Sequence, residues 1–287
     1  MKLIKKTVVV TGGGSGIGRQ LVLQLLNKGN RVAAIDVNQA SLDETKQLSG
    51  TDAARLSTHV ADITDRAAVC SLPEQINEIH KGIDVLINNA GIIQPFVPFN
   101  ELSYDQIKRV IDINVYGTML MIRAFLPYLG EQNTAHIVNV SSMGGFLPVP
   151  GQTLYGASKA AVKLLTEGLR AELSKTSISV SVVFPGGVST NITRNSGIST
   201  TEAKFQSDKQ ANKTTSAESA AATIIKGIEK GSPRILVGKD AKLMDLLSRI
   251  APVKAGRMMA KMMASIMEDS FTKPEDLDVK SCPDSEE

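Results

Sequence analysis

The sequence has little of several features that define other classes of protein. It contains only two cysteines, Cys70 and Cys282, which are far apart, and the second lies in a polar stretch. A disulfide framework is therefore not expected, and the cysteine use predicts a reducing compartment such as the cytoplasm. The formal net charge is only +3, and Lys and Arg are dispersed along most of the chain. This balance argues against a nucleic acid partner, and no metal site is predicted.

The beginning of the sequence lacks a long hydrophobic run. Residues 1–6 are basic, but the apolar stretch after them ends after three valines, at Thr11 and the glycines that follow. This pattern predicts neither a signal peptide nor a membrane span there. Low-complexity linkers are absent too. The 287 residues, 42% of them hydrophobic and 21% charged, favour one large α/β domain.

Apolar, β-branched stretches alternate with stretches of helical periodicity through most of the chain. The apolar stretches have no polar face, which is typical of a parallel sheet covered by helices. We therefore predict an α/β fold, a Rossmann-like doubly wound parallel sheet of about seven strands with helices on both faces. Ser103 with Gln106, and Thr215 with Glu218, have the capping-box spacing that predicts a helix start. The predicted strands are residues 7–10, 31–36, 55–60, 83–88, 136–140, 178–184 and 234–237.

A glycine-rich turn follows the first predicted strand. Gly12, Gly16 and Gly18 leave no Cβ where a diphosphate would touch the backbone, and the next helix offers free N–H groups and its positive end to an anion. The second predicted strand ends in Asp36, whose carboxylate can accept both hydroxyls of an adenosine ribose. By itself, the spacing G-x-x-x-G-x-G is also compatible with a tight turn that binds no ligand.

Three side chains further along form a candidate active site. Tyr155 and Lys159 are four residues apart in a predicted helix and so share one face. A lysine ammonium beside a tyrosine favours the phenolate and would lower the tyrosine pKa from its usual value of about 10. Ser142, at the end of the preceding strand, can donate a hydrogen bond to an oxygen that changes from alcohol to carbonyl, and Ser141 is the alternative donor. Together these groups can move a proton while a nicotinamide ring moves a hydride.

These motifs resemble those of the short-chain dehydrogenase/reductase family, of the single-domain kind with a Ser-Tyr-Lys-Asn active site. The resemblance covers roughly residues 5–238. It implies an oxidoreductase that interconverts a secondary alcohol and a ketone. The motifs occur in family order as Thr11-Gly12-x-x-x-Gly16-x-Gly18, Asn88-Asn89-Ala90-Gly91, Asn114, Ser142, Tyr155-x-x-x-Lys159 and Pro185-Gly186-x-Val188-x-Thr190.

The resemblance implies a role for each matching residue. Tyr155 would be the general acid/base, Ser142 would position and polarise the substrate oxygen, and Lys159 would bind the nicotinamide ribose. Asn114 matches the asparagine whose backbone holds a water for proton relay, although a buried asparagine is also compatible with a purely structural role. The cofactor would contact Gly12, Ser15, Gly16, Ile17, Gly18, Asp36, Asp62, Ile63, Asn89, Ala90, Gly91, Tyr155, Lys159, Pro185, Gly186, Val188 and Thr190.

The predicted dinucleotide is NAD rather than NADP. Asp36 would repel a 2′-phosphate, and Ser15 rather than a basic residue precedes the second glycine of the motif. Arg19, just inside the first helix, leaves the alternative of a contact with a phosphate. The resemblance also places Asp62 at the adenine amino group, with Ile63 beside the ring.

The two loops that approach the substrate in this family are apolar here. They are residues 92–99 and 143–150, and neither contains a cation to hold a carboxylate or phosphate. We therefore predict an apolar secondary alcohol or ketone, steroid-like or with an acyl chain. The alternatives are that these side chains only pack the loops, and that Arg194 or Lys204 meets an anionic substrate.

Two segments depart from the alternation of strands and helices. Residues 190–214 are polar and predict a lid over the ligand crevice, with a solvated loop as the alternative. Residues 241–267 are amphipathic, rich in Met and interspersed with Lys and Arg, and Pro252 predicts two helices. The amphipathic stripe could be part of the core, a contact between subunits or a cover on a pocket. It is also compatible with weak contact to an anionic membrane surface.

The predicted organisation is a catalytic domain at 1–238, a helical extension at 239–270 and a disordered tail at 271–287.

Two further hypotheses concern the oligomeric state and whether the protein is an enzyme. The resemblance implies a homodimer or homotetramer that pairs through the helices containing Asn114 and Tyr155, and the C-terminal extension favours the dimer. A nucleotide-sensing or scaffold protein without turnover is the alternative to an enzyme. The presence of both Tyr155 and Lys159 argues against that alternative.

Overall fold

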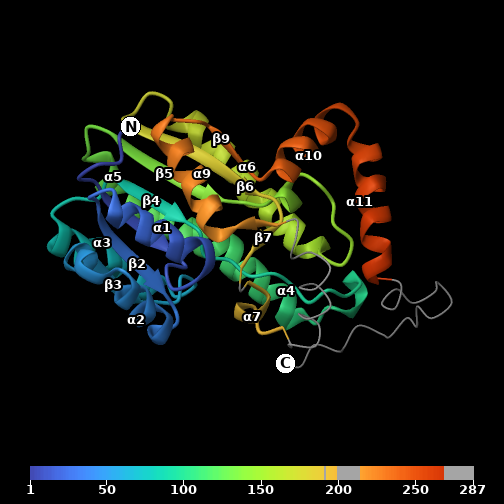
Figure 1. Ribbon diagram of the computed structural model, residues 1–287, viewed down its shortest axis with the longest axis horizontal. Coiled ribbons are helices and arrows are strands. Elements are labelled where there is room, and N and C mark those ends of the chain that lie inside the picture. Colours follow the sequence, from blue (N-terminus) through green and yellow to red (C-terminus); the bar gives the residue numbers. More distant parts are fainter. Residues whose placement is uncertain (191, 199–213, 268–287) are drawn as a thin grey trace.

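A computed structural model describes residues 1–190, 192–198 and 214–267. Its centre is a seven-stranded sheet in which all neighbouring strands run parallel (Figure 1). The predicted Rossmann-like doubly wound fold is confirmed, with a strand at each of the seven predicted places. In spatial order the strands are β3 (Leu56–Val60), β2 (Arg31–Asp36), β1 (Thr7–Thr11), β4 (Val85–Asn88), β5 (Ala135–Val140), β6 (Ile178–Pro185) and β9 (Arg234–Val237).

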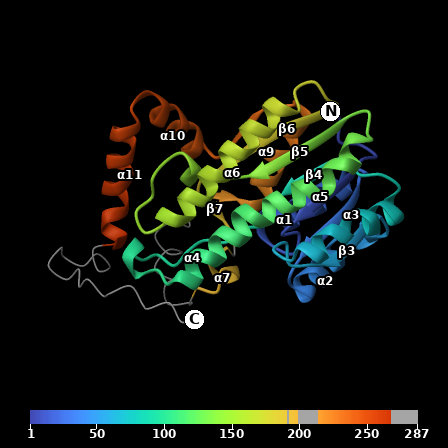
Figure 2. The same cartoon turned by 180° about the vertical axis from the view of Figure 1, so that it is seen from behind.

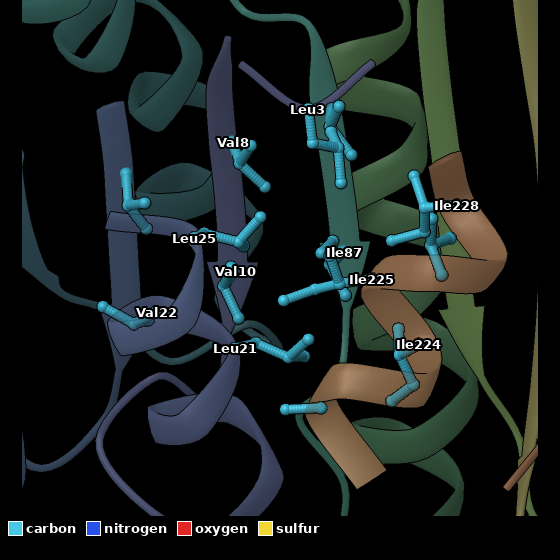
Figure 3. Packing of buried hydrophobic residues seen from close by; sticks show 14 of the residues in the cluster. Leu3, Val8, Val10, Leu21, Val22, Leu25, Ile87, Ile224, Ile225 and Ile228 are labelled. Carbon is cyan, nitrogen blue, oxygen red and sulfur yellow. The ribbon is translucent and has the colours of Figure 1, made fainter. Parts of the chain in front are cut away.

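Helices cover both faces of the sheet. Successive side chains of a strand point to opposite faces, so alternate residues of one strand pack against different helices. Val8 and Val10 of β1 pack in one apolar cluster with Leu25 of helix α1 (Gly16–Asn27) and Ile225 of α9 (Ala217–Glu229), as Figure 3 shows. Val9 belongs to the opposite cluster, which contains residues of α3 (Arg66–His80) and α5 (Thr118–Gly130). This burial on both faces explains why the strands lack a polar side.

All strands end at one edge of the sheet, where the loops that carry the predicted site gather. Figures 1 and 2 show the remaining helices around this sheet. These elements are α2 (Gln39–Leu48), α4 (Tyr104–Ile111), a π-helical segment (Asp112–Gly117), α6 (Thr153–Glu172), α7 (Ile192–Asn195), and the short strands β7 (Val188–Ser189) and β8 (Thr215–Ser216).

One of the two predicted capping boxes is correct. At the start of α4 the Ser103 hydroxyl accepts from Gln106 N, and Gln106 Oε1 accepts from Ser103 N. The box at Thr215 is wrong, because Thr215 pairs with Val188 in the β7–β8 ladder. The helix α9 therefore begins one residue later than predicted, with Ser216 as its N-cap.

One long helical stretch passes a test for membrane spans by length and composition. It is Tyr104–Gly130, which runs through α4, the π-helical segment and α5. The core helix of a soluble protein passes the same test. Met121, Phe125 and Leu129 of this stretch are fully buried in the apolar cluster on the sheet, so we describe it as a core helix.

The C-terminal segment forms two helices, as Pro252 predicts. They are α10 (Lys239–Ile250) and α11 (Pro252–Met267), and Figures 1 and 2 show them at the end of the molecule opposite α2 and α3. Their buried faces pack on the loop after β5, where Leu147 meets Met244 and Met259. The predicted tail at 271–287 and most of the predicted lid at 190–214 lie outside the described residues.

Candidate active site

The glycine turn between β1 and α1 has the geometry of an anion cradle. Gly12 and Gly16 have positive φ angles of 67° and 51°. A Cβ on Gly18 would lie 1.9 Å from the Gly12 carbonyl oxygen, so the turn closes only with glycine there. Ser15 is the N-cap of α1 but makes no side-chain capping hydrogen bond. The N–H groups of Ile17 and Gly18 thus do not donate to its hydroxyl, which suits a dinucleotide diphosphate at this helix start.

The ends of β1 and β4 are tied together beside this turn. Thr11 Oγ1 accepts from the backbone N–H groups of Asn89 and Ala90, both at 3.0 Å. Asn89 Nδ2 donates back to the Thr11 carbonyl at 3.0 Å. These hydrogen bonds fix the loop that contains Gly91. A Cβ on Gly91 would lie 2.9 Å from Lys159 Nζ, so the predicted cofactor loop directly borders the active-site lysine.

Three predicted adenosine contacts differ in their surroundings. Asp36 lies at the end of β2 and accepts from Gly14 N at 2.9 Å and from Asn38 N at 3.0 Å. Asp62 is exposed and accepts from the backbone and the hydroxyl of Thr64. Ile63 is buried in the apolar cluster of α3 and α5. Asp36 and Asp62 thus lie at the carboxyl edge of the sheet, while the Ile63 side chain packs in the core.

The predicted nicotinamide segment follows β6 and meets the glycine turn. A Cβ on Gly16 would lie 3.4 Å from Thr190 Cβ, and Asn195 Nδ2 donates to Ser15 Oγ at 2.8 Å. Val188 pairs in the short β7–β8 ladder. The segment therefore lies across the start of α1, within reach of the same ligand.

An acidic residue that the motifs did not reveal supports this segment. Asp240, in the first turn of α10, accepts a hydrogen bond from Gly187 N at 2.7 Å. A Cβ on Gly186 would lie 2.2 Å from the Asp240 carboxylate. The C-terminal extension thus contacts the end of β6 directly, and Pro185-Gly186 needs its glycine for that contact.

Ser142, Tyr155 and Lys159 come together as predicted. Ser142 lies close enough to Tyr155 to oppose the rise in the pKa of its hydroxyl, and Ser142 Oγ accepts from Gly144 N at 3.1 Å. Lys159 is buried, lies with its Nζ 5.9 Å from the centre of the Tyr155 ring, and donates to the Val140 carbonyl at 3.1 Å. Ser141, the alternative donor, is occupied because it donates to the Lys159 carbonyl at 2.7 Å.

The predicted effect of Lys159 on the pKa of Tyr155 is wrong for the protein alone. Burial raises the pKa of the Tyr155 hydroxyl above its usual value, and the neighbouring Ser142 hydroxyl only partly opposes this. Burial also lowers the pKa of Lys159 to about 8, so Lys159 keeps most of its charge at neutral pH but loses it at higher pH. Tyr155 is therefore protonated at neutral pH, when it can donate a proton.

Asn114 lies in the π-helical segment and joins two neighbouring elements. Its Nδ2 donates to the Ile92 carbonyl and to Ser158 Oγ, and its Oδ1 accepts from Ile92 N, all at 2.9 Å. The backbone carbonyl accepts from Thr118 Oγ1 at 2.9 Å. The structural role of this fully buried side chain is thus evident, while the relay role of its backbone stays a prediction.

A buried glutamine that sequence reasoning missed holds the start of α6. Gln94 Oε1 accepts from the backbone N–H groups of Leu154 and Tyr155, at 2.8 and 3.0 Å. Its Nε2 donates to the Gly151 carbonyl at 2.9 Å. The local N-cap, Gln152, makes no side-chain capping bond. Gln94 therefore acts as the cap of α6 from another loop and binds the backbone of Tyr155 itself.

The apolar loops predicted to meet substrate are partly packed inside the protein. Ile92 and Leu147 belong to two buried apolar clusters, as the packing alternative proposes. A cavity of about 490 Å³ lies between the loop at 144–150, one face of α6 and Gly256 of α11, without a charged side chain in its lining. Neither Ser142 nor Tyr155 lines it. Across the described part of the chain, no group of His, Cys, Asp or Glu is placed to hold a metal.

The parallel sheet, the glycine turn and the Ser-Tyr-Lys arrangement at its edge define a dinucleotide-binding oxidoreductase of the Rossmann-like class. A family model described as short chain dehydrogenase matches residues 6–200. The chain belongs to the short-chain dehydrogenase/reductase family. It is 35% identical over 262 residues to SadH of Mycobacterium tuberculosis, a protein named as an oxidoreductase, covering 89% of this chain and 94% of that protein.

Solved structures agree with this membership. A short chain dehydrogenase/reductase from Burkholderia phymatum in complex with NAD is 26% identical, with a TM-score of 0.79, over 87% of this chain and 96% of that chain. A short chain dehydrogenase from Burkholderia cenocepacia in complex with NADP is 25% identical, with a TM-score of 0.73, over 95% and 100% of the two chains. Similar structures thus hold one or the other nicotinamide dinucleotide.

Replacing Gln94 by methionine tests its role as a cap. The substitution keeps the length of the side chain but leaves Leu154 N and Tyr155 N without their acceptor, while the Gly151 carbonyl keeps only its bond from Gln152. We expect the free energy of unfolding to fall by about 1–3 kcal/mol and amide exchange at Leu154 and Tyr155 to quicken by at least about tenfold. Gln47→Met, on an exposed side chain of α2, is the control. Unchanged exchange in Gln94→Met would contradict the cap.

Proposed function

We propose that this protein is an NAD-dependent oxidoreductase that interconverts an apolar secondary alcohol and its ketone, with Tyr155 as the acid/base. The observation that carries the proposal is the meeting of Ser142, Tyr155 and the buried Lys159 at one place, where Lys159 also borders the loop tied to the glycine turn. Membership of the family supports the reaction class. The substrate class, the choice of dinucleotide and the role of Tyr155 are our inferences.

In this mechanism the chain moves a proton at one oxygen of the substrate. NAD, when bound, accepts a hydride from the alcohol carbon or, in its reduced form, returns it to the ketone carbon. During oxidation Tyr155 accepts the hydroxyl proton, and during reduction it donates that proton to the oxygen that becomes the alcohol. Ser142 donates a hydrogen bond to the same oxygen. Because burial raises the pKa of Tyr155, neutral pH favours proton donation and higher pH favours oxidation.

Charge around the glycine turn supports NAD rather than NADP. Asp36 accepts from Gly14 N beside the turn, and its carboxylate would repel a 2′-phosphate. Arg19, the alternative contact for a 2′-phosphate, is already bonded within the protein. Its guanidinium donates to the Gly14 carbonyl and to Glu44 Oε2, the latter at 2.6 Å. Since Glu44 compensates the charge of Arg19, Asp36 dominates the local field.

The loops beside Ser142 and Tyr155 support an apolar substrate. Residues 92–99 and 143–150 contain no charged side chain, so they offer nothing to pair with a carboxylate or phosphate. Arg194 of α7 is exposed, and Lys204, the other candidate anion contact, lies outside the described residues. An apolar alcohol or ketone, with a ring system or an acyl chain, fits this lining best.

Tyr155→Phe should lower kcat for the interconversion at least about 100-fold, because it removes the proton carrier and little volume. Binding of NAD, measured by calorimetry, should change by no more than about threefold. Tyr116→Phe removes the same hydroxyl from a side chain that is 57% exposed, and serves as the control. Activity of Tyr155→Phe equal to that of Tyr116→Phe would refute the role of Tyr155 as the acid/base.

Asp36→Asn tests the choice of dinucleotide. Asparagine keeps an oxygen for Gly14 N but removes the negative charge, so the ratio of kcat/KM with NAD to that with NADP should fall at least about tenfold. Asp43→Asn, on the exposed side of α2, controls for loss of a carboxylate near the turn. A ratio that does not move in Asp36→Asn would show that Asp36 does not read the ribose.

A further inference from the structure

A basic hollow lies along the outer edge of the sheet, away from the active site. It has a volume of about 390 Å³ and is formed by α9, the edge strand β9 and the start of α10. Lys226 and Lys230 of α9, Arg234 of β9 and Lys242 of α10 all line it. The proposed reaction uses none of these residues, so the hollow needs an explanation of its own.

Most of this positive charge has no acidic partner. Arg234 is neutralised, since it bonds to Glu167 at 3.0 Å and to Asp245 at 2.5 Å. Lys226, Lys230 and Lys242 are exposed, and among the described residues the ammonium group of none of the three forms a hydrogen bond or an ion pair. Three uncompensated ammonium groups around one hollow attract an anion.

An apolar stripe adjoins the hollow on α10. Leu243, Leu246 and Ile250 follow the three- and four-residue spacing of one helix face and are 63%, 58% and 74% exposed. Lys242 lies one helical turn before Leu246, so the basic hollow and the apolar stripe share the outer side of the same helix. Large apolar side chains gathered on a surface mark an interaction site.

Both acidic residues of α10 are already bonded within the protein. Asp240 accepts from Gly187 N, and Asp245 is 8% exposed and bonded to Arg234. By contrast, the remaining charged residues of α10 and α11 are all basic and exposed. They are Lys239, Lys242, Arg249, Lys254, Arg257 and Lys261.

We propose that this face, formed by the outer sides of α9, β9 and α10, docks on an anionic phospholipid bilayer. Lys226, Lys230 and Lys242 would meet headgroup phosphates while Leu243, Leu246 and Ile250 enter the boundary with the acyl chains. A second copy of the chain fits less well, because a two-fold contact centred on the hollow would bring these lysines against their own copies. The inference does not depend on the proposed reaction.

Co-sedimentation of the full chain with phosphatidylglycerol vesicles tests the proposal, with phosphatidylcholine vesicles as the uncharged comparison. We expect binding to the anionic vesicles only, and weaker binding as salt is added. The triple variant Lys226→Gln, Lys230→Gln, Lys242→Gln should lower the partition coefficient roughly 100-fold. The variant Leu243→Gln, Leu246→Gln, Ile250→Gln should lower it at least about tenfold.

Matched variants elsewhere serve as controls. Lys46→Gln, Arg66→Gln, Lys175→Gln removes the same charge outside this face, and Leu48→Gln, Ile79→Gln alters two side chains that are each 57% exposed. Both should bind vesicles as the unmodified chain does. Should a triple variant fail to fold, single lysine variants, each weakened about fivefold, take its place.

Three results would overturn the proposal. The first is absence of binding to phosphatidylglycerol vesicles, and the second is an equal loss of binding in the target and control variants. The third is a fall in solution mass, measured by sedimentation velocity, that occurs in the triple lysine variant or the triple apolar variant but not in the controls. Such a fall would show that a second copy of the chain covers this face.

Discussion

Three segments of the chain approach one another at Gly91, and the active site depends on that approach. A Cβ there would lie 2.9 Å from Lys159 Nζ and 3.0 Å from Asn114 Oδ1, so a larger residue would displace these side chains where the loop after β4 meets α6 and the π-helical segment. The same loop then binds Asn114 through Ile92 and caps α6 through Gln94. The positions of Tyr155 and Lys159 relative to the glycine turn therefore follow from one short loop.

The fold was largely predictable because burial on both faces of a parallel sheet leaves long apolar runs in the sequence. All seven strands lie where those runs predict them. Helix starts were predictable where the capping residues are neighbours, as at Ser103 and Gln106. The start of α9 was not, because Thr215 pairs with Val188, a contact between distant residues that no local pattern reveals.

The site was predictable where its residues form local motifs, as in the glycine turn and the pair Tyr155 and Lys159. Gln94 and Asp240 were missed because they bind partners 60 and 53 residues away. The direction of the pKa shift of Tyr155 was wrong because it depends on burial, which residue spacing does not report. Pairing of two subunits through the helices that contain Asn114 and Tyr155 stays a prediction. Leu164 of α6 is 68% exposed and so is free to meet another subunit.

The most direct test of this account measures reaction rates from the change in absorbance of the nicotinamide. The substrates are secondary alcohols and ketones graded from short and polar to steroid-sized and long-chain. The measurement is made with NAD and repeated with NADP. The account predicts turnover that increases with the apolar surface of the substrate and is faster with NAD. It would be contradicted if no member of the panel reacted although the protein binds NAD, or if only charged or short polar members reacted.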